Sequence, residues 1–245
     1  MNPEMAERLA EINREFYDDQ ARAFSDTRSP SGAELEWIIP WIPTGARVLD
    51  LGCGNGRTAV LLAARGFLDV YVGIDGSPVL LRGARESAAA IGIGVTSFLQ
   101  ANLLNDNIPV LLAREGLPPP FDVIMLLAVL HHVPGAIGRE RVVRQAADLL
   151  APTGRLLVSA WQFLDHARMR RKIVPWSVAG IAESVVDPGD ALLAWKGGNG
   201  YRYCHWIGEG ELGELARGTG LKIVFTTRAG GREGDLSLCA VLERE

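Results

Sequence analysis

The chain has 245 residues, 48% of them hydrophobic, and its 25 Lys and Arg against 29 Asp and Glu give a net charge of −4. It can bury one substantial core, and its acidic balance argues against binding nucleic acid through charge over the whole surface. It has no apolar run of the roughly 18 residues needed to span a bilayer and it begins with a polar stretch, so we expect a cytoplasmic protein that does not enter membranes. Its three cysteines have neither CxxC spacing nor histidine partners, so neither a disulfide framework nor a metal site is expected.

The pattern of apolar and polar residues predicts alternating strands and helices. Residues 4–24 predict a helix, followed by a turn and by a short apolar segment over 35–41. Strands are then expected at 47–51, 70–74, 95–99, 121–127 and 155–160, with helices at 56–65, 78–90 and 138–150. A helix at 209–217 and strands at 222–227 and 236–242 follow near the end. Continuous apolar strands that alternate with helices indicate a parallel sheet covered on both faces.

These seven strands predict an α/β fold with a Rossmann-like, doubly wound sheet, mostly parallel with an antiparallel last strand. We expect one domain with four parts: an N-terminal helical lid over 1–42, a cofactor-binding core over 43–162, an insertion over 163–200 at the active-site end, and residues 201–245 completing the sheet. The insertion includes a stretch that reads as helical and carries a basic segment, residues 168–172. A solvated helix face is the simpler interpretation of that segment, and a local nucleic-acid patch is the alternative.

A glycine-rich turn follows the first predicted strand, where a doubly wound sheet binds its ligand. It reads Asp50-Leu51-Gly52-Cys53-Gly54-Asn55-Gly56. Glycine permits turn conformations and close approaches that a Cβ would prevent, and the carboxylate of Asp50 can meet a positive charge. Several nucleotide-binding folds use glycines in this way, so a dinucleotide dehydrogenase is the main rival interpretation.

Two acidic residues and the glycine spacing favour a different ligand. Asp75 ends the second predicted strand, where a carboxylate can accept hydrogen bonds from both hydroxyls of a ribose. A dinucleotide fingerprint places its last glycine three residues on, whereas here the spacing is Gly52-x-Gly54-x-Gly56. Asp50 would repel a pyrophosphate but suits a ligand with ammonium and sulfonium charges. The turn therefore predicts binding of S-adenosylmethionine.

Asn102 and Leu103 follow the third predicted strand. There the amide of Asn102 could read the edge of an adenine while Leu103 packs on its ring. A turn-forming role for Asn102 is the alternative, because asparagine side chains often bond to nearby backbone.

Four stretches resemble the class I S-adenosylmethionine-dependent methyltransferases over roughly residues 45–161. They read VLDLGCGNGRT, VGIDGSP, FDVIMLLAVLHHV and GRLLVSAW. Motifs at 16–17, 23–28, 128–132, 159–161, 201–206 and 210–212 are similar to the tRNA wobble-uridine methyltransferases, which esterify a carboxymethyl group on that uridine. The short basic segment and the acidic net charge depart from what that family suggests for a protein that binds tRNA unaided. Because its eukaryotic members work with a small zinc-binding activator subunit, the resemblance adds tRNA and such a subunit as possible partners.

The resemblance also implies which residues hold the cofactor and its product, S-adenosylhomocysteine. Asp50 and the glycines would hold the methionine end, Asp75 the ribose, and Leu127 with Ala128 the sulfonium side. Tyr17 and Arg28 would belong to the lid. The full expected set is Tyr17, Arg28, Asp50, Gly52, Gly54, Asn55, Gly56, Asp75, Gly76, Ser77, Asn102, Leu103, Leu127 and Ala128.

Methyl transfer is an in-line displacement on a carbon activated by positive sulfur, so the protein mainly supplies alignment and a dry site. A carboxylate acceptor needs only orientation, for which arginine is suited, and Arg28 and Arg202 are the candidates. A phenol, alcohol or amine would need a base, and His131 or His132 after the fourth strand is best placed. One of the pair is expected to be structural, and His132 is taken as the catalytic candidate.

The sequence supports three functional hypotheses. The first is methylation of the carboxymethyl group of wobble uridine in tRNA. In this reaction Trp161, Tyr203 and Trp206 could stack on an extruded base. Packing in the core is the simpler role for any one of these aromatic residues. The second is O- or N-methylation of a small molecule, and the third is cofactor binding without catalysis, which the complete set of acids and glycines disfavours. The first two differ in whether the basic segment, Arg202 and the aromatic residues face one cleft.

Overall fold

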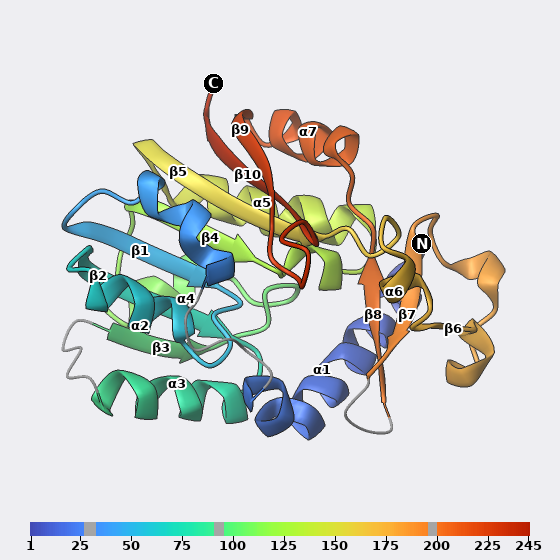
Figure 1. Cartoon of the computed structure of the whole chain (residues 1–245). Coiled ribbons are helices and arrows are strands. Elements are labelled where there is room, and N and C mark those ends of the chain that lie inside the picture. Colours follow the sequence, from blue (N-terminus) through green and yellow to red (C-terminus); the bar gives the residue numbers. More distant parts are fainter. Residues whose placement is uncertain (27–32, 91–95, 196–199) are drawn as a thin grey trace.

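The structure is a computed structural model that describes residues 1–26, 33–90, 96–195 and 200–245, with only the backbone described at 21–26 and 33 (Figure 1). Its centre is a seven-stranded sheet in the order β3-β2-β1-β4-β5-β10-β9. The strands from β1 to β5 pair in parallel, and β10 runs antiparallel to both β5 and β9. The predicted fold class is confirmed. The strands are β1 (Ala46–Leu51), β2 (Leu68–Asp75), β3 (Thr96–Gln100), β4 (Phe121–Leu127), β5 (Leu150–Trp161), β9 (Leu221–Ala229) and β10 (Ser237–Arg244).

The central strands are buried on both faces because successive side chains point to opposite sides of the sheet. In β1, Leu49 belongs to one apolar cluster and Val48 to the other. One cluster is covered by α4 (Ile108–Arg114), α5 (Ala136–Leu149) and α7 (Glu209–Gly218). The other is covered by α2 (Arg57–Ala64), α3 (Pro78–Ala90) and the 3-10 helix η1 (Ala33–Trp41). The sheet is therefore doubly wound.

A smaller antiparallel sheet lies beside the main one (Figure 1). It consists of β6 (Ile173–Val174), β7 (Asp190–Ala194) and β8 (Tyr201–His205). The long helix α1 (Pro3–Asp26) packs on it, with the buried Leu9 against Trp176, Leu192 and Tyr203. Residues 201–205 thus pair with the insertion instead of joining the main sheet, so the predicted boundary at residue 200 separates two strands of one sheet.

The predicted helix through the basic segment is wrong. Only α6 (Ala167–Arg170), a single turn, forms there, and the chain enters β6 three residues later. The β-branched pair Ile173 and Val174 favours strand, and Pro175 disfavours helix in the residue before it. The described residues also form three short 3-10 helices: η2 (Leu130–His132), η3 (Trp176–Ala179) and η4 (Glu183–Val185). Among the described residues, no helix has the length and apolar character needed to cross a membrane.

Candidate active site

A cavity of about 1170 Å³ lies at the carboxyl ends of the central parallel strands. Its walls come from those strand ends, from α1 and η1, and from the hairpin loop between β9 and β10, residues 230–236. This is where an open α/β sheet binds its ligand. The cavity brings together most of the predicted cofactor residues: Tyr17, Asp50, Gly52, Gly54, Asn55, Asp75, Gly76, Ser77, Asn102, Leu103, Leu127 and Ala128.

The three glycines of the turn all have positive φ, but they face different surroundings. A Cβ on Gly52 would collide with Cγ2 of Val129, and a Cβ on Gly56 would lie 2.8 Å from Cβ of Ala84 in α3. A Cβ on Gly54 would meet no atom of the described residues within 4 Å. Gly56 does not line the cavity and instead lets α2 approach α3, whereas Gly54 leaves room that a ligand can fill.

Asp75 holds the turn in place as well as lining the cavity. Its Oδ2 accepts a hydrogen bond from the Gly54 amide at 2.8 Å, and its Oδ1 accepts one from the Ser77 amide at 2.9 Å. Burial raises the pKa of Asp75, although these two amide bonds act in the opposite direction. Each oxygen keeps a lone pair for a ribose hydroxyl. Asp18 of α1 joins this group because the Ser77 hydroxyl donates to its Oδ1 at 3.0 Å.

Asp50 is a buried carboxyl group at the base of the turn. It is 2% exposed, and the hydroxyl of the fully buried Tyr71 donates to its Oδ2 at 2.5 Å. Burial raises the pKa of Asp50 to about 7. The sequence analysis did not predict that Tyr71 bonds to Asp50. The signal for it was a tyrosine among the aliphatic residues of a buried strand.

The side chain of Asn102 takes the turn-forming role. Its Oδ1 accepts from the Leu104 amide at 2.9 Å, and the Asn102 amide donates to Oδ2 of Asp106 at 2.7 Å. Both Asn102 and Leu103 also line the cavity, so the turn presents them toward it. Their contact with an adenine stays a prediction.

The two neighbouring histidines have different surroundings. His131 is fully buried, stacks on Trp161 and accepts a hydrogen bond from the Trp161 amide at its Nδ1, 3.3 Å away. His132 lines the cavity. Its Nδ1 lies 2.9 Å from the Tyr203 carbonyl oxygen, and its Nε2 lies 2.8 Å from the Tyr17 hydroxyl. His132 is therefore the member of the pair that a bound molecule can reach.

Helix α1 also contributes a residue that sequence reasoning missed. Asn13 is 6% exposed, and its Nδ2 donates to the His132 carbonyl at 3.1 Å. Its Oδ1 accepts from the Tyr203 amide at 2.8 Å. Asn13 and Tyr17 lie four residues apart on one face of α1, next to the buried Leu9 and Phe16. The signal in the sequence was this polar residue on an apolar helix face.

Arg202 lies outside the cavity lining. It is 5% exposed, and its guanidinium carbon lies 4.4 Å from the ring centre of Trp161, 5.1 Å from Phe16 and 5.2 Å from Trp195. Among the described residues, none accepts a hydrogen bond from its Nη1. Arg28 lies outside the described residues, and roles of both arginines in acceptor binding stay predictions.

The other residues expected to mark an RNA cleft do not converge on the cavity. Of the three aromatic side chains proposed to stack on a base, Trp161 lines the cavity. Tyr203 is fully buried, and Trp206 packs against the apolar cluster that includes Trp161 but does not line the cavity. None of the residues 168–172 lines the cavity.

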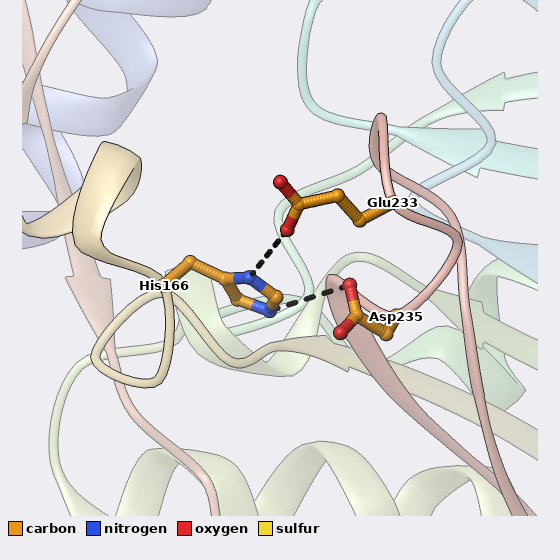
Figure 2. A group of neighbouring side chains, drawn as sticks. All are labelled: His166, Glu233 and Asp235. Atoms are coloured by element: carbon orange, nitrogen blue, oxygen red, sulfur yellow. Dashed lines mark ion pairs between the residues drawn. The ribbon is translucent and has the colours of Figure 1, made fainter.

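Ion pairs connect the end of β9 and the 230–236 hairpin that follows it to the segment after β5. Arg228 lies 3.2 Å from Asp165, and His166 lies 3.8 Å from both Glu233 and Asp235 (Figure 2). The two carboxylates approach different nitrogens of the His166 ring. His166, Glu233 and Asp235 are residue types that can ligate a metal. Because the two carboxylates lie at different nitrogens of one imidazole ring, we interpret the group as ion pairs that connect two segments of the chain.

Residues 17–225 match the family model described as Methyltransferase domain. The chain belongs to this methyltransferase family. A protein of Encephalitozoon cuniculi whose name describes a methyltransferase is 30% identical over 94% of the chain and 93% of its own length. The ubiquinone biosynthesis O-methyltransferase of Xylella fastidiosa is 40% identical over 51% of the chain and 46% of its own length. The probable tRNA methyltransferase 9B of Mus musculus is 25% identical over 73% of the chain and 36% of its own length. The chain thus spans less than half of the last two relatives.

Solved structures share the fold of this methyltransferase. The magnesium protoporphyrin IX methyltransferase of Synechocystis with bound S-adenosylhomocysteine has a TM-score of 0.64 at 18% identity, over 96% of the chain and 99% of its own. The methyltransferase in a complex with the Haloferax volcanii Trm112 activator also has a TM-score of 0.64, at 15% identity, over 94% of the chain and 96% of its own. With the family match, the chain is an S-adenosylmethionine-dependent methyltransferase.

Proposed function

We propose that this methyltransferase transfers a methyl group to a protic oxygen, a phenol or an alcohol, of a small molecule, with His132 as the base. The observation that carries the proposal is the hydrogen bonding of the His132 ring. The Tyr203 carbonyl can only accept, so the nearby Nδ1 bears the hydrogen and the neutral ring has its lone pair on Nε2. Sγ of Cys204 lies farther from Nδ1, at 3.7 Å. A phenol or alcohol needs such a base, whereas a carboxylate does not.

The residues around the turn suit S-adenosylmethionine, the donor implied by the family. Asp50 would face its ammonium group, Asp75 its ribose hydroxyls, and the open side of Gly54 would admit its amino-acid portion. The sulfonium supplies an activated methyl group when the donor is bound. The chain itself supplies orientation, exclusion of water and a place for the acceptor's proton.

The surroundings of the cavity support a small acceptor. Its walls include α1, η1 and the 230–236 hairpin, which would enclose a molecule on several sides. The basic segment and Arg202 do not line it. The described arginines that do, Arg14, Arg57 and Arg228, are each paired with a carboxylate, which opposes their use as contacts for the phosphates of tRNA.

Methylation of wobble-uridine carboxymethyl groups is the second candidate. It is supported by the sequence motifs, by the tRNA methyltransferase relative and by the fold neighbour that assembles with an activator. Under this candidate the chain would act on tRNA and with a small activator subunit.

The two candidates leave chemically different products. We expect that protein incubated with methyl-labelled S-adenosylmethionine transfers label to a small-molecule extract or a panel of phenols, in a linkage that resists mild alkali as an ether does. His132→Gln should retain donor binding by calorimetry and slow transfer about 100-fold. Label in total tRNA that mild alkali releases, as from a methyl ester, would reject the first candidate in favour of the second.

A further inference from the structure

We infer that helix α1 is part of the catalytic machinery: the Tyr17 hydroxyl meets the acceptor's O–H group and relays its proton to Nε2 of His132, and Asn13 is the positioning residue. The inference rests on the proposed function, because it specifies how a protic acceptor loses its proton. Its basis is a closed ring of hydrogen bonds that joins α1, η2 and β8.

Three hydrogen bonds close the ring among Asn13, His132 and Tyr203, and a fourth attaches Tyr17 to it. Tyr17 reaches Nε2 of His132 at 2.8 Å, and Nδ1 of the same imidazole reaches the Tyr203 carbonyl at 2.9 Å. The Tyr203 amide donates to Oδ1 of Asn13 at 2.8 Å, and Nδ2 of Asn13 donates to the His132 carbonyl at 3.1 Å. Because Asn13 and Tyr17 lie one helical turn apart, α1 holds the backbone of His132 and the tip of its ring at once.

Backbone groups fix the direction of each bond in this ring. The Tyr203 N–H must donate, which orients the Asn13 amide so that its NH₂ group faces the His132 carbonyl. The Tyr203 carbonyl must accept, which places the hydrogen of the neutral imidazole on Nδ1. Nε2 is then an acceptor, so the Tyr17 hydroxyl is the donor.

Tyr17 is therefore the group that the acceptor would contact. The single lone pair of Nε2 is directed at the Tyr17 hydroxyl, and Tyr17 lines the cavity. A phenol group donates through its hydrogen and accepts through its oxygen, so an acceptor hydroxyl bonded to the Tyr17 oxygen would reach the base through it.

The transfer balances in one step with established methyltransferase chemistry. The acceptor oxygen forms the new C–O bond as the C–S bond of the donor breaks, and sulfur keeps that electron pair as a thioether. The acceptor's proton passes to the Tyr17 oxygen while the Tyr17 proton passes to Nε2. The resulting imidazolium keeps its Nδ1–H bond to the Tyr203 carbonyl, which favours the charged ring.

A double-mutant cycle tests the relay on an acceptor found by labelling. We expect Tyr17→Phe and His132→Gln each to lower kcat about 100-fold, and the double variant to be little worse than either, because both remove one proton path. Tyr201→Phe is the matched control, since its hydroxyl bonds the Val178 carbonyl at an exposed site away from the cavity. A Tyr17→Phe variant with the wild-type kcat would overturn the relay and leave the proposed function intact.

A second measurement requires no acceptor. Imidazole ¹⁵N shifts at pH 8.5, with His132 identified from the His132→Gln variant, should report an Nδ1–H tautomer in the wild type. The near-isosteric Asn13→Asp keeps the oxygen that accepts from Tyr203 and removes the donor to the His132 carbonyl. It should leave donor affinity within about twofold, perturb the His132 shifts and lower kcat about tenfold. An Nε2–H tautomer in the wild type, or unchanged shifts and kcat in Asn13→Asp, would overturn the inference.

Discussion

At the scale of single residues, the protonation of Asp50 determines when its side chain can hold a positive group. Burial raises the pKa of this carboxyl to about 7. A donor ammonium group favours the carboxylate, so we expect the dissociation constant of S-adenosylmethionine to rise about tenfold per pH unit below pH 7. Calorimetry between pH 5.5 and 7.5 measures this dependence.

Two controls separate this linkage from other pH effects. Asp50→Asn should bind weakly with a nearly flat dependence over the same range. In the absence of donor the sign is opposite: a raised pKa contributes stability that is fully present below about pH 4 and is lost as pH rises through 7. Donor affinity that does not change across the range would contradict the assignment of Asp50 to the ammonium group.

The glycines of the turn provide a matched pair of substitutions. Gly54→Ala should keep the fold to within about 1 kcal/mol, because only the positive φ is unfavourable, yet it should weaken donor binding at least tenfold by filling the open side of the turn. Gly52→Ala adds a collision with Val129 and should cost a few kcal/mol of stability. Thermal melts and calorimetry separate the two effects, and a Gly54→Ala variant with wild-type affinity would show that no ligand occupies that space.

The position of the turn and its acids at the cavity was predictable because it depends on local features of the chain: a strand end, glycines and carboxylates at short spacing. The choice between His131 and His132 was not, because it depends on whether the ring faces Trp161 or Tyr17, which are distant in sequence. Asn13 was missed for the same reason, since both of its partners lie more than 100 residues away.

At the scale of elements, the parallel strands were predictable from their continuous apolar runs. The short helix α4 was missed because it has only seven residues with Pro109 near its start, and the Asn107 side chain caps it by accepting from the Val110 amide. The small sheet of β6, β7 and β8 was also missed, because pairing between short strands leaves little local pattern.

The contribution of ion pairs to holding the 230–236 hairpin in place can be tested directly. Its ion pairs are exposed, and pairs of that kind contribute at most about 1 kcal/mol each. The double variant Asp165→Asn with Asp235→Asn should therefore melt within a few degrees of wild type. It should nevertheless be cut faster by trypsin after the exposed Arg232, because the hairpin opens more often.

Glu140→Gln is the matched control, because it removes an exposed ion pair to Arg144 on the distant helix α5. It should leave the cleavage rate at Arg232 unchanged. Equal cleavage rates in the double variant and the wild type would mean that the remaining contacts hold the hairpin: the His166–Glu233 pair and the 2.7 Å backbone bond from the Gln162 amide to the Leu236 carbonyl.

At the scale of the whole molecule, a buried polar network joins the small sheet to the main sheet. His205 of β8 bonds Asp190 of β7 at 2.6 Å and Glu211 of α7 at 2.9 Å. Glu211 in turn accepts from the buried Arg139 of α5 at 2.7 Å, and the Tyr203 hydroxyl donates to Asp190 at 2.7 Å. Both ring nitrogens can donate to these carboxylates only in the imidazolium form, so the pair favours protonated His205.

This network predicts how stability changes with pH. Burial alone would lower the pKa of His205, but its hydrogen bonds to Asp190 and Glu211 outweigh burial and raise it. A raised histidine pKa contributes stability that is fully present below about pH 6.5 and is lost as pH rises through the folded-state value. We expect the free energy of unfolding, from urea titrations, to fall between pH 6.5 and 9. His205→Gln should make this fall smaller, leaving the part that Asp50 contributes near pH 7, and should cost about 3 kcal/mol at pH 6, because it leaves Asp190 buried beside no cation. Parallel pH dependences for variant and wild type would mean that the two sheets are held together by the apolar cluster of Trp161 with Leu193 and Cys204 without help from the imidazolium.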